Sequence, residues 1–179
     1  RLNASLKMPN ADRFANLFLG RDNPRNIVTD KPDELARRPL PVRELVADRV
    51  FFAGVGLKFV DRFDVRLGFR GGLKPYAQVR YGQAWQLGRA DRVEFRETLF
   101  WSVDDRVGAT TVLAYEHELS STLAARWLGA ATITQRVSKF DWSNSFGLYR
   151  SMGEQRLVTL EVLASGLQGS PIGVLDYGL

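Results

Sequence analysis

The chain has 179 residues, and because none of them is cysteine it has neither disulfides nor thiolate metal ligands. Hydrophobic residues make up 45%, yet no uninterrupted apolar run approaches the roughly 20 residues of a transmembrane helix. The formal net charge of +5 favours anionic partners such as nucleic acid, lipid head groups or an anion-attracting lumen. Because the basic residues are spread along the chain rather than clustered, the pattern argues against nucleic acid.

The N-terminal residues predict two strands. Apolar and polar residues alternate over residues 1–8, residues 9–12 predict a turn, and residues 13–20 predict a second, less regular strand. Arg1 leads directly into the alternation, without the basic start and apolar core of a signal peptide. We therefore expect either that a signal has been removed or that the chain begins inside a longer protein.

Residues 21–48 interrupt the alternation. Four prolines in this segment are incompatible with regular strand pairing, and residues 33–38, after Pro32, predict one or two turns of helix. Connections longer than about 12–15 residues are usually functional or mobile. Two alternatives remain open, a long solvated outer loop and a loop that folds into the lumen of a barrel as a constriction or plug.

The remaining residues predict nine further strands, and residues 76–119 show the pattern most clearly. On each strand one face is apolar and the other polar, because side chains alternate along a strand. The predicted strands cover Val50–Val60 and residues 64–70, 76–87, 93–101, 111–119, 123–133, 142–149, 158–164 and 175–179. Turns of glycine, aspartate and serine separate them, including residues 88–91 and 104–108.

About eleven strands joined mostly by short turns predict an antiparallel up-and-down arrangement, since parallel sheets need crossover connections that are missing here. Several runs exceed the roughly 5–6 residues usual in soluble sheets and fit the roughly 9–11 residues of a tilted membrane strand. The turns also tend to alternate between shorter and longer, as do periplasmic turns and outer loops of membrane barrels, which assigns residues 21–48 to the outside of the cell.

Aromatic residues recur on the apolar face near the predicted strand ends: Phe51, Phe59, Phe69, Tyr81, Trp85, Phe95, Trp101, Tyr115, Trp127 and Trp142. Through this pattern the chain resembles the outer-membrane β-barrel proteins of Gram-negative bacteria, whose aromatic girdles lie at the two membrane interfaces. The resemblance covers nearly the whole chain but contains no signature motif. It implies that residues 1–179 form one transmembrane β-barrel domain in the outer membrane, with the lipid bilayer as a partner.

Two features depart from this class of barrels. Bacterial single-chain barrels have an even number of strands, and they usually end on a strand with a terminal aromatic residue, whereas this sequence ends at Leu179. We therefore expect the full protein to contain twelve strands or more.

Charged residues recur on the polar face near the middle of the predicted strands: Arg66, Arg80, Glu94, Arg96, Glu116, Arg126 and Glu161. Such residues are suited to a lumen that contains water or hydrogen-bonded partners, not to a dry core. Cross-strand ion pairs of Glu94 with Arg80 are geometrically plausible. Two interpretations remain open: the charges neutralise one another in a closed barrel, or surplus arginines line an aqueous pore that favours anions.

Catalytic and cofactor motifs are weak in this sequence, and we expect no enzyme activity, no cofactor and no metal. His117 is the one histidine, and the nearby Ser120 and Ser121 are expected to occupy a tight turn. Asp104 and Asp105 are adjacent, so on a strand their side chains would point in opposite directions.

The sequence predicts a passive pore for small, possibly anionic solutes as the first function. The alternative is a non-conducting structural or assembly barrel that anchors a protein partner or a periplasmic domain. A weaker alternative is a membrane-embedded lipid-modifying enzyme, which requires His117 to face a polar cavity beside a serine or a carboxylate. A soluble barrel that binds an apolar ligand is the alternative without a membrane.

Overall fold

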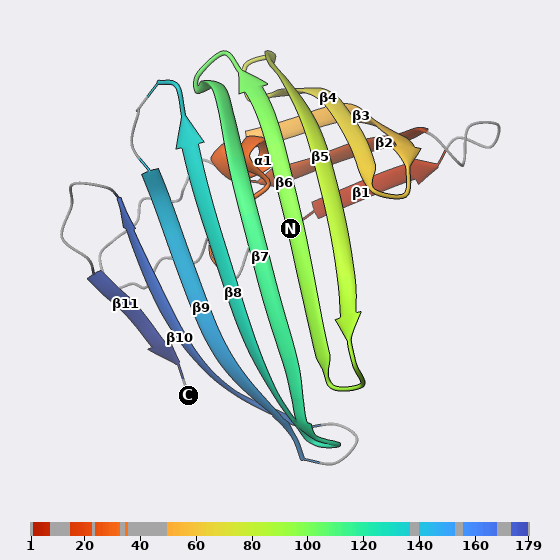
Figure 1. Cartoon of the computed structure of the whole chain (residues 1–179). Coiled ribbons are helices and arrows are strands. Elements are labelled where there is room, and N and C mark those ends of the chain that lie inside the picture. Colours follow the sequence, from red (N-terminus) through yellow and green to blue (C-terminus); the bar gives the residue numbers. More distant parts are fainter. Residues whose placement is uncertain are drawn as a thin grey trace.

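The computed structural model describes residues 2–7, 15–22, 24–32, 35, 50–136, 140–152, 156–167 and 173–178. Within these residues, eleven strands form one antiparallel sheet in which each strand pairs with its neighbours in sequence (Figure 1). The strands are β1 (Leu2–Lys7), β2 (Ala15–Asp22), β3 (Val50–Val60), β4 (Phe63–Arg70), β5 (Lys74–Leu87), β6 (Asp91–Ser102), β7 (Arg106–Ser120), β8 (Leu123–Thr134), β9 (Phe140–Ser151), β10 (Leu157–Leu167) and β11 (Gly173–Gly178).

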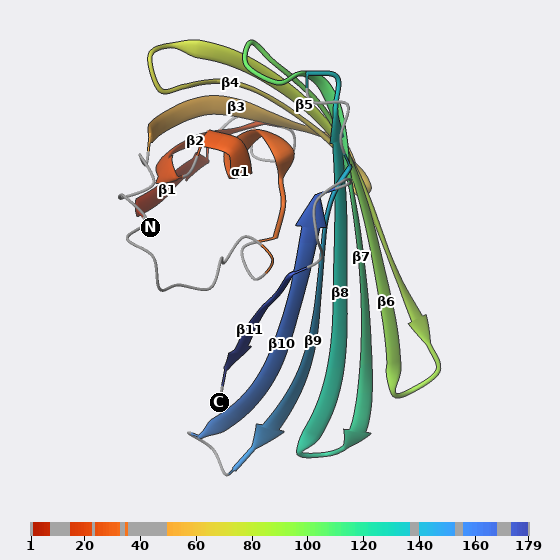
Figure 2. The ribbon, with the colours of Figure 1, turned by 90° about the vertical axis from the view of Figure 1, so that its left-hand side faces the viewer.

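This topology confirms the all-β, antiparallel up-and-down arrangement that the alternation predicts. The described strands do not close into a barrel, because β1 pairs with β2 and β11 pairs with β10, which leaves these two strands at the edges of the sheet. The sheet curves, and the short helix α1 (Pro24–Thr29) lies inside the curve (Figure 2). No described helix has the length and apolar character needed to span a membrane.

Several boundaries differ from the sequence prediction. The strand β7 begins at Arg106 rather than at residue 111, because Val107 and Ala109 continue the alternation into the expected turn. The turn itself lies at residues 103–105. The second strand is shifted by two residues, from 13–20 to Ala15–Asp22.

The polar face of the sheet is the buried face. Small polar residues and a few larger ones are almost inaccessible there: Arg70, Gln78, Thr98, Ser102, Thr110, Thr132, Thr134, Ser143 and Ser145. The alternate positions on the same strands are apolar and exposed, as Leu99 at 55% and Ile133 at 52% illustrate. An ordinary soluble sheet with one solvated face has the opposite arrangement, with apolar residues toward the core and polar residues toward water.

The concave face is packed by hydrogen bonds and two small apolar clusters. Across β7 and β8, the buried hydroxyls of Thr110 and Thr132 lie 3.0 Å apart and share a hydrogen bond. Phe18 of β2 faces inward and packs against the cluster of Val28, Tyr76 and Phe100, which explains why apolar residues fall on both faces of this strand.

An ion-pair network connects β4 and β5 with the β6–β7 turn. The buried guanidinium of Arg70 donates to the Ser102 hydroxyl and to the carboxylates of Asp104 and Asp105, at 3.2–3.3 Å. Lys74 Nζ lies 3.0 Å from Asp104 Oδ1. The hydrogen bond from Lys74 lowers the pKa of Asp104 below its ordinary value, and the charges of Lys74, Arg70 and Arg136 lower it further. At neutral pH the Asp104 carboxylate is therefore ionised and pairs with Lys74 and Arg70.

Glycine at position 68 makes room for an aromatic ring. Gly68 pairs with Gly54 across β3 and β4, and a Cβ atom at Gly68 would lie 2.6 Å from the Ala53 carbonyl oxygen and 2.9 Å from the Tyr76 hydroxyl. Gly82 of β5 lies on the same face of the sheet as Gly68, but a Cβ atom there would meet nothing within 4 Å.

We expect Gly68→Ala to destabilise the sheet by about 1–3 kcal/mol, because overpacking forces backbone or ring shifts. Gly82→Ala is the matched control and should be neutral or slightly stabilising. The urea midpoint of the folded protein, followed by tryptophan fluorescence, measures both effects. Equal midpoints for the two variants would contradict the close packing at Gly68.

Candidate functional site

The segment between β2 and β3 crosses the concave face of the sheet. Gln78 of β5 is 3% exposed, and its Nε2 donates to the carbonyl oxygens of Ile27 at 2.7 Å and Val28 at 2.5 Å. These bonds satisfy two carbonyls near the C-terminal end of α1, which have no partner within so short a helix. The Val28 side chain is fully buried beside Tyr76 and Phe100. The helix is therefore held both by polar contacts and by apolar packing.

Beyond α1 the segment stays on the concave face and reaches the C-terminal strands of the sheet. Leu35 is buried in a cluster with side chains of β7, β8 and β10: Val112, Ala114, Leu128, Ala130 and Leu163. Lys31 Nζ lies 3.3 Å from Asp141 Oδ1 of β9. Helical turns were predicted over residues 33–38, and Leu35 is the one residue of this range that the structure describes. Residues 23 and 39–49 also lie outside the described residues. The described part of the segment lies on the concave face of the sheet.

Asp30, which directly follows α1, is the centre of a cluster of arginines. Its Oδ2 lies 3.0 Å from Arg80 Nη1 and 3.3 Å from Arg96 Nε, and its Oδ1 lies 3.9 Å from Arg66 Nη1. Its main-chain carbonyl accepts a hydrogen bond from Arg96 Nη2 at 3.1 Å. The Thr98 hydroxyl lies 3.4 Å from Oδ2. Three adjacent strands, β4, β5 and β6, thus direct three guanidinium groups and one hydroxyl toward the Asp30 carboxylate.

A second carboxylate supports the same arginines from within the sheet. Arg80 Nε donates to Asp64 Oδ2 at 2.7 Å, and Arg66 Nε lies 3.4 Å from Asp64 Oδ1. The described cluster therefore contains three guanidinium groups and two carboxylates. These side chains are only 19–35% exposed, so their interactions are screened less than those of surface ion pairs.

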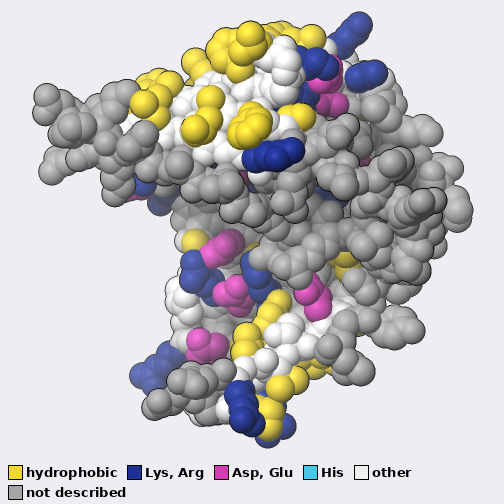
Figure 3. All heavy atoms as spheres, turned by 180° about the vertical axis from the view of Figure 1, so that it is seen from behind, with side chains coloured by type: hydrophobic (Ala, Val, Ile, Leu, Met, Phe, Trp, Pro, Cys, Tyr) yellow, Lys and Arg dark blue, Asp and Glu magenta, His cyan; other side chains and the backbone are white. Residues whose placement is uncertain are grey.

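All seven charged residues singled out by the alternation lie on the concave face, but they do not form one cluster. Arg66, Arg80 and Arg96 converge on Asp30. Farther along the sheet, Arg126 Nε lies 3.1 Å from Glu116 Oε1, and the Ser145 hydroxyl donates to Glu161. Figure 3 shows basic and acidic side chains side by side over the lower part of the molecule.

The structure does not pair Glu94 with Arg80. The register places Glu94 opposite Ala84 on β5 and Ala114 on β7. The carboxylate instead forms an ion pair with Arg92, two residues away on the same face of its own strand. The alternation assigns the face correctly, but it does not define which residues stand opposite one another.

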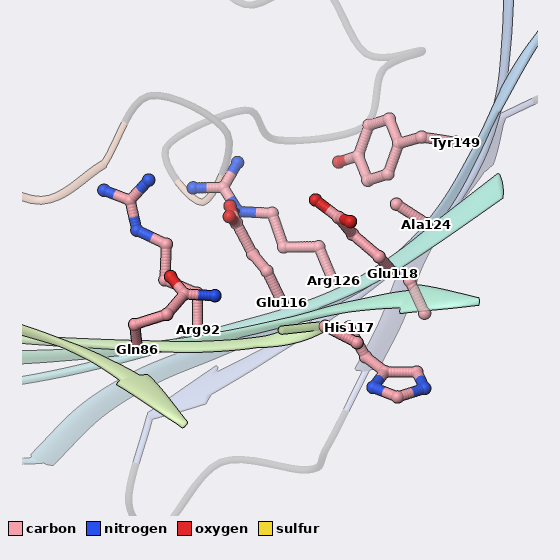
Figure 4. Close-up of a pocket in the computed structure, with 10 residues that line it drawn as sticks. Gln86, Arg92, Glu116, His117, Glu118, Ala124, Arg126 and Tyr149 are labelled. Atoms are coloured by element: carbon pink, nitrogen blue, oxygen red, sulfur yellow. The ribbon is translucent and has the colours of Figure 1, made fainter. Parts of the chain in front are cut away.

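Two cavities open on the concave face. One, of about 590 Å³, lies beside the arginine cluster and includes Pro32, Glu94, Arg96, Arg126 and Leu128 in its lining. The other, of about 400 Å³, is lined by side chains of β5 to β9, with Arg92, Glu116, Glu118, Arg126 and Tyr149 around it (Figure 4). Both cavities combine charged groups with apolar walls.

The side chain of His117 points away from the side of the sheet that carries Glu116, Glu118 and Arg126 (Figure 4). Its Nδ1 lies 2.7 Å from Asp91 Oδ1, which also accepts a hydrogen bond from the Tyr115 hydroxyl at 2.6 Å. His117 thus has a carboxylate beside it on the convex face, and it also contributes to the lining of the cavity of about 400 Å³.

The ten aromatic residues expected at the membrane interfaces occupy the convex positions of their strands. Six are clearly exposed: Phe51, Phe59, Phe69, Trp85, Trp101 and Tyr115. Tyr81 packs between Phe63 and Phe95, with ring centroids 4.9 and 6.2 Å away. Trp127 and Trp142 are half-buried. Rings from neighbouring strands therefore support one another on the convex surface.

Among the described residues, no group of three or more histidines, aspartates and glutamates is arranged to hold a metal ion. No family model, curated protein or solved structure matches the chain.

The hydrogen bonds of Gln78 generate a prediction about the segment that crosses the concave face. Gln78→Leu keeps the size of the side chain but leaves two buried carbonyl groups without a donor, which costs about 1–3 kcal/mol for each group. We expect faster amide hydrogen exchange over residues 24–32, measured by mass spectrometry. Gln86→Leu, on the same face of β5 but exposed, is the control and should leave this exchange unchanged. Equal exchange in both variants would contradict the role of Gln78.

Proposed function

We propose that this chain forms part of the wall of a transmembrane β-barrel in the outer membrane of a Gram-negative bacterium. The inverted polarity of the sheet carries this proposal, because the convex face exposes large apolar side chains whereas the concave face buries polar ones. In lipid this arrangement is favourable, since apolar side chains face the hydrocarbon and polar ones face the lumen. Five consecutive strands, β5 to β9, have 12–15 residues, enough to cross the hydrocarbon region at a tilt.

Closure of the sheet belongs to the same proposal. In the bilayer, the unpaired backbone groups of the edge strands β1 and β11 would each cost several kcal/mol. We infer that the barrel contains twelve strands or more, so that both edges find a partner and the strand number is even. The lipid bilayer is then the partner of the convex face.

Within this barrel, the function that the geometry supports best is a narrow passive pore for small, anionic solutes. The arginine cluster contains one more cation than carboxylates, and Arg96 of this cluster lines the neighbouring cavity together with Arg126, Asp61 and Glu94. Charged side chains that line a pore select ions of the opposite charge. The segment of residues 24–32 and Leu35 narrows the lumen, so we expect a small conductance rather than a wide, water-filled channel.

The second candidate is a non-conducting barrel that anchors a protein partner or a periplasmic domain. One observation favours it: the segment packs against both apolar clusters of the concave face, one with Phe18 and Tyr76 and the other with Leu163. Most charges on that face also have a partner of opposite sign.

Single-channel recording of the full-length protein in planar bilayers distinguishes these functions. We expect small, steady conductance with a reversal potential that indicates anion preference in a salt gradient. Stable insertion without conductance would overturn the pore and leave the anchoring barrel. Failure to insert, with the protein soluble without detergent, would overturn the membrane barrel itself.

The lipid-facing assignment of the convex face is tested by a charge in the middle of a strand. Leu99 is exposed in β6, and we expect Leu99→Arg to cost about 2–4 kcal/mol if it lies near the bilayer midplane. Val103→Arg places the same charge in the β6–β7 turn, where head groups and water accommodate it, and serves as the control. The folded fraction after refolding into lipid vesicles measures both effects. Equal folding of the two variants would contradict a lipid-facing Leu99.

A further inference from the structure

The arginine cluster has the geometry of a ligand site. Arg66, Arg80 and Arg96 come from three neighbouring strands of a hydrogen-bonded sheet, so the backbone fixes their spacing. They converge on Asp30, a carboxylate that the sheet does not supply and that a connecting segment brings in. We propose that these three arginines form a binding site for the oxyanion of a small solute, a carboxylate or a phosphate group, and that the Asp30 carboxylate fills this site as an internal substitute.

The donor set suits an oxyanion. Guanidinium groups bind carboxylates and phosphates through parallel hydrogen bonds, and Thr98 adds a hydroxyl. Asp30 does not use every donor, because the buried Nε of Arg96 makes no hydrogen bond within the described residues although it lies 3.3 Å from Oδ2. Without Asp30, Asp64 would remain as the one described carboxylate among the three arginines.

A cavity borders the cluster at Arg96. The cavity of about 590 Å³ is lined by Arg96 of the cluster and by Pro32, two residues beyond Asp30. Its volume is in the range of ordinary small-molecule sites, roughly 300–1,000 Å³. The lining also includes Arg126, which is paired with Glu116, and the carboxylates of Asp61 and Glu94.

Binding proceeds by exchange of the Asp30 carboxylate for the anion of the solute. Asp30 is tethered in place by the buried Val28 on one side and by the Lys31–Asp141 ion pair on the other, which gives it a high effective concentration. A solute anion therefore competes with Asp30, and its binding releases the segment from the arginines. By reciprocity, loosening Asp30 strengthens anion binding by the same factor. A role of this site in transport rests on the proposed pore. The binding test below does not require the protein to conduct ions.

Asp30→Asn tests the site in detergent solution, with inorganic phosphate as the probe and isothermal titration calorimetry as the measurement. Asparagine tolerates the left-handed backbone of this position, where φ is 53°, and it removes only the charge. We expect phosphate affinity to rise about tenfold over the native protein, within the usual range of coupling between competing ligands. Asp141→Asn is the control, because it removes an ion pair of the same segment but leaves Asp30 among the arginines. It should raise phosphate affinity far less.

The gain must also depend on the arginines. Adding Arg80→Gln to Asp30→Asn should abolish it. In the native protein, excess phosphate at constant ionic strength should speed amide hydrogen exchange over residues 24–32 relative to chloride. This measurement tests the displacement of Asp30 even if a variant misfolds. No gain in Asp30→Asn, an equal gain in Asp141→Asn, or no effect of phosphate on native exchange would each overturn the proposal. Phosphate binding without membrane insertion would remove the pore but not the site.

Discussion

Guanidinium groups that lose much of their water require negative charge within a few ångströms, and the concave face of this sheet holds three of them close together. Asp64, on the sheet itself, compensates only part of that charge. The remaining compensation comes from Asp30, so the position of the whole connecting segment is coupled to the electrostatics of the sheet. Without that carboxylate, the three cations would repel one another across neighbouring strands, and the concave face would attract any anion able to reach it.

The segment itself has little structure of its own to contribute. An isolated helix as short as α1, with six residues, is far below the roughly 12–15 residues at which isolated helices become even marginally stable. Its conformation therefore depends on the sheet: Gln78 satisfies its carbonyls, Tyr76 and Phe100 enclose Val28, and the arginines hold Asp30. This dependence makes the segment well suited to displacement by a solute anion, because displacing it costs contacts with the sheet but does not unfold an independent domain.

The alternation of side chains was sufficient to predict the strands, their antiparallel order and the face of the charged and aromatic residues singled out in the sequence. The period of two survives in a sequence whenever one face of a strand is apolar, and from β3 to β10 the convex face is mostly apolar. Val112, Leu128 and Leu163 interrupt the polar face. The position of Asp30 was not predictable. Residues 21–48 have no periodicity, and a single aspartate between a short helix and a proline gives no signal of three arginines more than 30 residues away. The partner of Glu94 was missed for a related reason, because the alternation assigns a face but the register, set by turn lengths, decides which residues meet.

The contacts of the segment also differ from those of the sheet in their range along the chain. Every strand pairs with its neighbour in sequence, so the sheet can grow hairpin by hairpin as each strand follows the last. Lys31, by contrast, meets Asp141, 110 residues away, and Leu35 meets Leu163. These contacts close long loops and cannot form before β9 and β10 are in place. The contacts of Asp30 need only β4 to β6, whereas the contacts of Lys31 and Leu35 complete the docking of the segment only once most of the sheet exists.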